Sequence, residues 1–349
     1  MDELKRLAIP LLGWYNDNKR DLPWRQPGPD GRPQPYHVWV SEIMLQQTRV
    51  AAVMGYYARF LERFPTVEDL AKADEDSLMK CWQDLGYYSR ARNLQKAARI
   101  VCGQYGGVFP ADYAAIRALP GVGDYTAGAI SSIAFGLPHA AVDGNVLRVV
   151  SRLTADHSDI TAPAVKKAVA QALEAVMPVK AAGEFNQALM ELGATVCLPN
   201  GAPLCDRCPA GDFCRARLEN LTDVLPVKSG KKPRRVEERQ VYLLFNRGRV
   251  ALRKRPGKGL LAGLWEFPNT LEGEPPPLPL PDLEFAGTAR HIFTHIEWHM
   301  TAYAGTLEGG ALPSGWVWAD REDLQHTYSV PSAFSGFSDA VWTRLDNER

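Results

Sequence analysis

Four of the six cysteines crowd one short stretch with the spacing C-x7-C-x2-C-x5-C, namely Cys197, Cys205, Cys208 and Cys214. The other two, Cys81 and Cys102, lie far upstream. In a chain whose start carries no secretion signal, this clustering indicates metal binding rather than disulfide bonds. Four thiolates can hold a [4Fe-4S] cluster or a structural zinc ion. The spacing favours the cluster, because zinc sites more often use two C-x2-C pairs and this array has one.

Two acidic residues lie among apolar neighbours. Glu42 stands beside the apolar stripe of a predicted helix in Val40–Thr48, and Asp143 lies within Val142–Val146. Buried carboxylates are rare unless they have a partner or a task. Each also has an ordinary explanation, since an isolated Glu is usually solvated and an Asp is a good helix N-cap. A chemical role requires the fold to bring the two into one pocket.

A glycine-rich turn, Leu119–Gly123, precedes a helix predicted from about Thr126. Gly121 and Gly123 allow close approach of a ligand to the backbone, and the start of the helix offers unpaired N–H groups suited to a phosphate. This is the form of a helix-hairpin-helix. Taken alone, such a turn is more often a simple helical corner.

The elements that carry these residues change character along the chain. Helical apolar spacing up to about residue 221 predicts an all-α domain over residues 1–222. Residues 223–239 hold two prolines and a run of basic residues without apolar periodicity, which predicts a linker. Residues 240–349 form the second predicted domain, which is rich in strands.

Within the second domain, Val241–Phe245 and Val250–Leu252 predict a β-hairpin. Two further strands are predicted, one with an apolar face made by Ile292, Ile296, Trp298 and Met300, the other containing Trp316 and Trp318. The proline-rich stretch 274–281 predicts an exposed loop. Period two also places His295, Glu297 and His299 on one face as a candidate metal trio, although mixed polar faces are commonly just solvated.

Length and charge set broad limits. A chain of 349 residues suits two domains, and 46% apolar residues can build their cores. Basic and acidic residues balance at 40 each, so overall charge gives no support for nucleic-acid binding. The first twenty residues mix charges with a short apolar run, which argues against a signal peptide or membrane span. We therefore expect a cytoplasmic protein without membrane association.

Taken in order, the helix-hairpin-helix, the acid that follows it and the four-cysteine array resemble the endonuclease III superfamily of base-excision glycosylases. Four segments resemble motifs of its MutY-type adenine glycosylase family: Ser41–Thr48, Gly86–Leu94, Val142–Val146 and Phe185–Leu189. The resemblance runs through the whole helical domain. It implies a mainly α helix-hairpin-helix glycosylase domain with a four-cysteine cluster loop, followed by an α+β Nudix-like domain.

The resemblance implies removal of adenine mispaired with 8-oxoguanine or guanine from double-stranded DNA, by hydrolysis of its N-glycosidic bond. Such enzymes rotate the target nucleotide out of the stack. The catalytic group would be Glu42 as general acid, Asp143 as stabiliser of the oxocarbenium-like sugar, and Tyr125 and Asn145 as orienting residues. The adenine would be surrounded by Trp24, Arg25, Leu45, Val50 and Gln187.

Further contacts implied by the resemblance lie on the DNA. Gln46, Gln47 and Tyr88 would fill or wedge the vacated stack. Arg90 and Arg92, with Gly121 and Gly123 of the hairpin, would contact phosphates. The cofactor would be a [4Fe-4S] cluster on the four cysteines, although the first gap is one residue longer than the spacing expected in the family. We expect a monomer.

Two positions bear on strand cleavage. Lyase-competent relatives carry a Schiff-base lysine two residues after the second hairpin glycine, where this chain has Tyr125. Leu147 replaces a lysine found in some adenine glycosylases. These residues predict base removal without efficient strand cleavage.

In the second domain, Gly259–Pro268 resembles the Nudix-like lesion-recognition domain of the family, without a Nudix box to support nucleotide hydrolysis. Phe293, Thr294 and His295 match a Phe-Ser-His loop that contacts 8-oxoguanine, with Thr in place of Ser. Three alternatives remain open from the sequence: a glycosylase for G:T or damaged pyrimidine pairs, a noncatalytic metal-stabilised DNA-binding module, and a Nudix hydrolase with a helical appendage.

Overall fold

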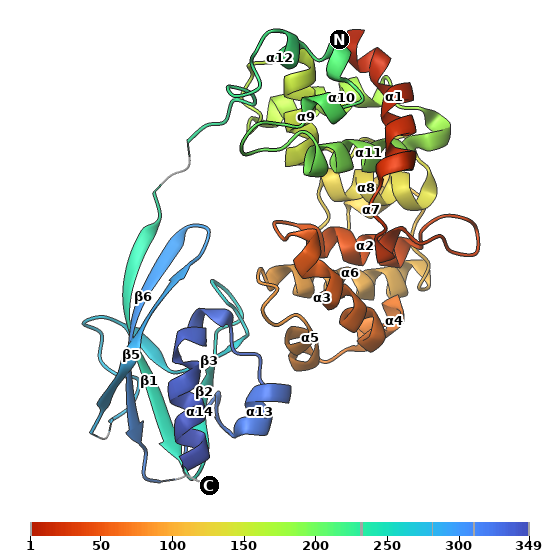
Figure 1. Cartoon of the computed structure of the whole chain (residues 1–349). Coiled ribbons are helices and arrows are strands. Elements are labelled where there is room, and N and C mark those ends of the chain that lie inside the picture. The colour runs from red at the N-terminus through yellow and green to blue at the C-terminus, as the bar shows by residue number, and fades with distance from the viewer. Residues whose placement is uncertain (1, 231–232, 281, 310, 348–349) are drawn as a thin grey trace. The chain divides into compact units, whose positions relative to one another are not determined.

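The computed structural model describes residues 2–230, 233–280, 282–309 and 311–347. It divides into two compact units (Figure 1). The first comprises Met1–Tyr57, Thr66–Ala71 and Asn93–Gly230, and the second comprises Ala58–Pro65, Lys72–Arg92 and Lys231–Arg349. The units therefore do not follow a single cut between helices and strands, because two helical segments group with the C-terminal part.

The N-terminal two thirds of the chain are helical, as expected. The α-helices there are α1 Asp2–Asn18, α2 Pro35–Leu45, α3 Val50–Arg63, α4 Val67–Lys72, α5 Glu75–Cys81, α6 Ser89–Tyr105, α7 Tyr113–Arg117, α8 Asp124–Phe135, α9 Gly144–Thr154, α10 Pro163–Glu174, α11 Ala182–Thr195 and α12 Arg215–Leu218. Short 3₁₀ turns are η1 Pro23–Arg25, η2 Val179–Ala181, η3 Cys205–Arg207 and η4 Gly211–Phe213.

Helix α8 is the central element of the first unit. Nearly all its residues from Thr126 onward are buried, and it packs against α2, α7 and α11. A helix that is apolar on all sides belongs inside a core. It begins at Asp124, two residues earlier than the sequence predicted, with Gly123 as N-cap. Together α7, the turn and α8 form the predicted helix-hairpin-helix.

Helices α9 and α11 approach each other closely at the first turn of α9. A Cβ atom added to Gly193 on α11 would lie 2.5 Å from the Cβ of Asn145 in the first turn of α9. Only glycine fits at such a distance. Asp143 is the N-cap of α9, and its side chain accepts a hydrogen bond from the Val146 amide. The ordinary reading of Asp143 as a cap is therefore correct, and it does not exclude a second role.

In the described residues, seven strands form one mixed sheet with the order β3-β2-β1-β6-β5, in which β4 pairs with β1 and β7 with β2. The strands are β1 Arg235–Asn246, β2 Arg249–Lys254, β3 Trp265–Glu266, β4 Asn269–Leu271, β5 Glu284–Ile292, β6 Ile296–Thr306 and β7 Trp316–Ala319. The remaining helical elements are α13 Arg321–His326, η5 Ser332–Phe337 and α14 Ser338–Asn347.

The core of the second unit lies on one face of this sheet. Alternate residues of β1, such as Val241, Leu243 and Phe245, pack with η5 and α14, which runs beside β1 and β2 (Figure 1). The opposite face carries Tyr242 and Leu244, against which leucines of the proline-rich loop pack. This alternation is the period-two pattern of a strand.

The predicted hairpin is confirmed, with Phe245 paired to Val250 and Asn246 to Arg249. The loop 274–280 has no regular structure, as expected, and residue 281 lies outside the described residues. The strand predicted across Ile292 to Met300 is wrong in its span. The chain turns at residues 293–295, so Ile292 ends β5 while Ile296 begins β6. Ile292 pairs with Glu297 and lies half-exposed, on the face opposite to Trp298.

The predicted linker 223–239 is shorter in the structure. Strand β1 begins at Arg235, because it pairs in parallel with β6 from Arg235 opposite Ile296. At the other end, the carbonyl oxygens of Thr222 and Leu225 accept hydrogen bonds from the buried Arg152. Both ends of the basic segment are thus tied into folded structure. Residues 231–232 lie outside the described residues.

No helix among the described residues has both the length and the apolar character needed to cross a membrane.

Candidate active site and four-cysteine cavity

A cavity of about 450 Å³ opens in the first unit between η1, α2, α3, α8, α9 and α11. Its volume is in the range of small-ligand pockets. Every residue predicted to act on the base or to surround it lines this cavity, namely Glu42, Asp143, Tyr125, Asn145, Trp24, Arg25, Leu45, Val50 and Gln187. The fold therefore brings Glu42 and Asp143 into one pocket, although they lie about a hundred residues apart in the chain.

Glu42 projects from the buried side of α2 into this cavity. Its Oε2 accepts a hydrogen bond of 2.5 Å from the Tyr125 hydroxyl. Burial raises the pKa of Glu42 to about 7, the charge of Asp143 adds to the rise, and the Tyr125 hydrogen bond and Arg25 oppose it. A carboxyl that titrates near neutral pH can donate a proton there, as a general acid must.

Asp143 differs from Glu42 in its hydrogen bonds. Its carboxylate accepts two donors at 2.8 Å, the backbone amide of Val146 and the Nδ2 of Asn145. Burial raises the pKa of Asp143, but these two hydrogen bonds and the positive charge of Arg148 favour the ionised form. Two carboxyls in one pocket thus have different partners, which suits different tasks.

Asn145 is itself held from behind by a buried arginine. Arg148 donates from Nη2 to the Asn145 Oδ1 at 2.9 Å and to the Gly193 carbonyl at 2.7 Å, and from Nε to the Cys197 carbonyl at 2.8 Å. The orientation of the Asn145 amide is fixed by this contact, since its Nδ2 must then face Asp143. The same guanidinium contacts the backbone of the first cysteine of the array.

Several side chains that the sequence patterns did not mark also line the cavity, among them Arg20, Met190 and Glu191. Met190 and Glu191 lie three and four residues after Gln187 on α11, so helical spacing could have found them. The sulfur of Met190 accepts a 3.3 Å contact from the Tyr125 hydroxyl. No comparable signal in the sequence marks Arg20.

The hairpin glycines adopt the conformations that the turn requires. Gly121 has φ of +78°, and a Cβ there would lie 2.8 Å from the Cβ of Asn93. Both Gly121 and Gly123 are exposed, and α8 starts directly after them. Contact with a phosphate stays a prediction.

The residues predicted to enter or bind the DNA fall into two groups. Gln47 is exposed with φ of +58°, and Gln46 donates to the Thr126 hydroxyl at 3.3 Å. Tyr88, by contrast, is only 6% exposed, and its hydroxyl accepts the Asp84 amide. Its neighbour Tyr87 has φ of +48° and is 44% exposed. The exposed aromatic of this segment is therefore Tyr87, and the burial of Tyr88 does not support its predicted role as a wedge, which stays a prediction.

The two arginines of this segment already have partners in the chain. Arg90 is buried, donates to the carbonyl oxygens of Leu85 and Gly86, and has its pKa lowered to about 10 by burial. Arg92 is paired with Glu75 at 3.2 Å. Arg90 thus stabilises the turn before α6 that carries Tyr87 and Tyr88. This arrangement does not support the predicted phosphate contact.

Phe293, Thr294 and His295 form the turn between β5 and β6. The Phe293 ring packs edge-on against the buried Trp298, with centroids 4.9 Å apart, whereas Thr294 and His295 are exposed. The candidate metal trio does not form among the described residues. His299 instead contacts Glu297 at 2.7 Å and Glu238 at 2.9 Å, and His295 lies in the turn.

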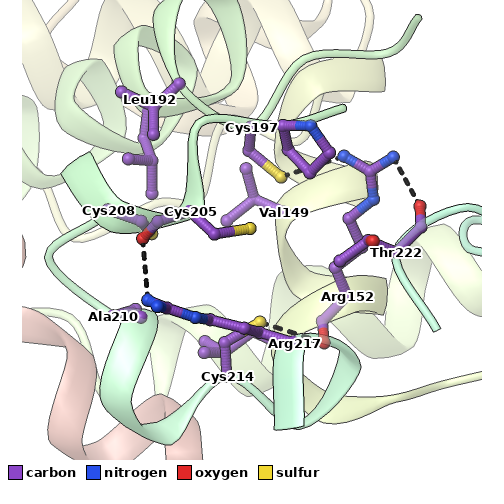
Figure 2. Close-up of a pocket in the computed structure, with 14 residues that line it drawn as sticks. Val149, Arg152, Leu192, Cys197, Cys205, Cys208, Ala210, Cys214, Arg217 and Thr222 are labelled. Carbon is purple, nitrogen blue, oxygen red and sulfur yellow. Dashed lines mark hydrogen bonds between the residues drawn. The ribbon is translucent and has the colours of Figure 1, made fainter. Parts of the chain in front are cut away.

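The four cysteines Cys197, Cys205, Cys208 and Cys214 line one small cavity at the end of the helical region, shown in Figure 2. The rest of the lining is mainly apolar, with Arg152 and Arg217. Arg152 contacts the Cys197 sulfur at 3.4 Å. As they stand, no three metal-ligating side chains of the described residues lie at metal-binding distance. The donor set fits an iron–sulfur cluster, because all four donors are sulfur and the nearby guanidinium groups oppose the negative charge of such a cluster.

Comparisons with known proteins define the class. A model of the HhH-GPD superfamily of base excision DNA repair proteins matches residues 40–175, and a NUDIX domain model matches residues 240–339. A thermostable thymine-DNA glycosylase of known structure is 31% identical, with a TM-score of 0.56, and the match covers 62% of this chain and 98% of that one. The chain therefore combines a helix-hairpin-helix base excision repair domain with a Nudix-like domain.

The particular family follows from sequence comparison. The adenine DNA glycosylase of Homo sapiens is 37% identical over 93% of this chain and 71% of its own length. That of Schizosaccharomyces pombe is 33% identical over 93% of this chain and 87% of its own length. The chain belongs to the adenine DNA glycosylase family and is an enzyme of base excision repair.

Proposed function

We propose that this adenine DNA glycosylase acts on double-stranded DNA in which adenine lies opposite 8-oxoguanine or guanine, and that it removes the base without cutting the strand. The observation that carries the proposal is the shared pocket of Glu42 and Asp143, in which one carboxyl has a pKa of about 7 and the other is held by two hydrogen-bond donors.

In this mechanism the extruded adenine enters the cavity between Trp24, Leu45, Val50 and Gln187. Glu42 donates its proton to N7 of the base. The glycosidic bond then breaks, and its electron pair goes to the protonated base, which leaves as a neutral molecule. Protonation of the leaving group lowers the barrier in the same way as in glycoside hydrolysis.

Asp143 stabilises the positive charge that develops on the sugar, directly or through a transient covalent adduct. Asn145 orients the Asp143 carboxylate, and the Tyr125 hydroxyl orients Glu42. A water molecule then adds to C1′ of the sugar and gives its proton to the Glu42 carboxylate, which completes hydrolysis. Among the described residues no lysine lines the cavity, and Tyr125 stands where the family resemblance implies the lysine of a lyase. Base removal without a Schiff base leaves the strand intact.

On the DNA, Gln46, Gln47 and Tyr87 would occupy the space that the adenine vacates. The hairpin with Gly121 and Gly123 would bind a phosphate through the amides at the start of α8. Thr294 and His295 are exposed at the turn where the family resemblance places 8-oxoguanine contacts.

The four cysteines would hold a [4Fe-4S] cluster, which ties the loop from Cys197 to Cys214 into one structure. Cys197 would join this cluster while its carbonyl oxygen accepts the bond from Arg148.

The direct test is single-turnover release of adenine from a duplex with A opposite 8-oxoguanine, beside matched A:T and G:T duplexes. Selective release from the first, with strand breaks only after alkali, is the expected result. Preference for the G:T duplex would replace the proposed substrate, and strand cleavage without alkali would contradict the monofunctional mechanism.

A further inference from the structure

Glu191 lies at the wall of the same cavity and pairs with two arginines. Arg20 donates from Nε to Oε1 at 2.5 Å and from Nη2 to Oε2 at 3.1 Å. Arg25 donates from Nη2 to Oε2 at 2.7 Å. The side chain of Glu191 is only 1% exposed, against 15% for Arg25 and 39% for Arg20. One carboxylate thus forms ion pairs with two guanidinium groups.

These contacts also fix where Arg25 lies. Its Nη1 donates to the Arg20 carbonyl at 2.9 Å, and its guanidinium lies over the Tyr15 ring, 5.6 Å from the centroid. Glu191, on α11, adds a third contact that holds Arg25 in place. Because η1 supplies Arg25, the carboxylate joins two segments of the chain that lie far apart in the sequence.

Arg25 links this group to Glu42, because its positive charge opposes the rise in the pKa of Glu42. The ionisable groups that face Glu42 are Tyr125 from α8, Asp143 from the start of α9 and Arg25 from η1. Burial alone would raise the pKa of Glu191, but Arg20 and Arg25 outweigh it and lower the pKa. Glu191 is therefore ionised, and the three charges sum to one positive charge rather than two.

We propose that Glu191 is a positioning residue that holds Arg25 in the pocket wall and cancels one of the two positive charges there, so that Glu42 stays protonated until adenine enters. The proposal rests on the proposed role of Glu42 as general acid. Without Glu191, two uncompensated guanidinium groups would favour the Glu42 carboxylate, since opposite charges in a partly buried site interact strongly.

The experiment compares pH–rate profiles of single-turnover adenine release for Glu191→Gln and the unchanged protein, between about pH 5 and pH 9. A general acid works while it is protonated, so the rate falls as pH rises through the pKa of Glu42. In the variant, the descending limb of the profile should move to lower pH by on the order of one unit. At pH values above the limb, this shift corresponds to about a tenfold loss of rate. At low pH the two rates should converge.

Two further variants test the direction of the expected shift and its specificity for Glu191. Arg20→Gln removes one of the positive charges, so its descending limb should move to higher pH. Glu184→Gln makes the same change of charge as Glu191→Gln on the exposed side of α11, and its profile should match that of the unchanged protein. A loss of rate in Glu191→Gln that is equal at every pH would show a merely structural role and overturn the proposal.

A carboxyl-carbon NMR titration of the folded protein without DNA separates this proposal from the proposed function. The Glu42 signal is identified by its absence in Glu42→Gln. A lower midpoint in Glu191→Gln supports the proposal even if Glu42 proves not to be the acid. An unchanged midpoint overturns it, whatever the protein does to adenine. If Glu191→Gln does not fold, the upward shift expected of Arg20→Gln provides the same decision.

Discussion

The base pocket and the four-cysteine cavity lie in the same unit but are completed in different ways. In the pocket each buried carboxylate has protein donors: Tyr125 for Glu42, Val146 and Asn145 for Asp143, and two arginines for Glu191. In the cavity the cysteines are arranged by a loop with two 3₁₀ turns, and apolar side chains and arginines surround them. The fold itself prepares the pocket, whereas the sulfur atoms around the cavity would be drawn together by the proposed cluster.

Among the substitutions that test this contrast, those of the pocket carboxylates should have the largest effect on the rate of adenine release. Asp143→Asn should keep the N-cap of α9, because Asn caps helices as well as Asp does. The charge that stabilises the sugar is lost, so adenine release should fall by about 10³-fold or more. Single-turnover kinetics measures the rate, and thermal unfolding with iron content serves as control. A large loss of thermal stability would mean that the cap, not the charge, is the main role.

Glu42→Gln should reduce adenine release by about 10³-fold, with binding of the mismatched duplex retained.

The raised pKa of Glu42 also predicts that the same substitution stabilises the folded protein at high pH, although it slows the reaction. A buried carboxyl favours folding when protonated, and that contribution is lost as pH rises through about 7. Glu42→Gln should therefore unfold at a higher temperature than the unchanged protein above that pH, and at a similar temperature well below it. Equal unfolding temperatures at high pH would contradict the raised pKa.

On the cavity side, Cys208→Ser should lower the iron content and the unfolding temperature together, by about 10 °C for a loss of a few kcal/mol. Thr195→Ser, a similarly small change on nearby α11, serves as the matched control. If the iron-free protein remained folded with bound zinc, the assignment of an iron–sulfur cluster would fail.

A smaller effect is expected from Tyr125→Phe, which removes the hydrogen bond to Glu42 but keeps the ring. That hydrogen bond opposes the rise in the pKa of Glu42, so the descending limb of the pH–rate profile should move to higher pH. The rate below neutral pH should fall by about tenfold, the order of a single hydrogen bond. A limb that moved to lower pH would rule out this role for the hydroxyl.

The smallest effect separates the two adjacent tyrosines. Tyr87→Ala should weaken binding to the mismatched duplex by about fivefold, because this exposed ring stacks on bases in the proposed complex. Tyr88→Phe should leave that affinity unchanged, because its buried hydroxyl only accepts the Asp84 amide. Equilibrium titration at fixed salt measures both, and the reverse order would support Tyr88 as the wedge.

Local patterns predicted the helices, the hairpin at residues 246–249 and the strand at Trp316, since each depends on periodicity or turn residues within a few positions. The errors lie where local patterns are ambiguous. Apolar alternation at Ile292 and Ile296 continues across a turn, so the sequence gives no sign that the strand reverses. The start of β1 at Arg235 depends on pairing with β6, which lies some sixty residues away.

For the site, the spacing of the four cysteines marked a metal-binding array, whereas the roles of Glu42 and Asp143 were implied only by the family resemblance of the motifs around them. The tertiary structure decided what surrounds them. Burial raises the pKa of Glu42, and the backbone at Tyr87 decides which tyrosine is exposed. The pairing of Glu191 with Arg20 and Arg25 joins segments about 170 residues apart. Burial and long-range charge pairs arise only when distant segments meet, and no local pattern encodes them.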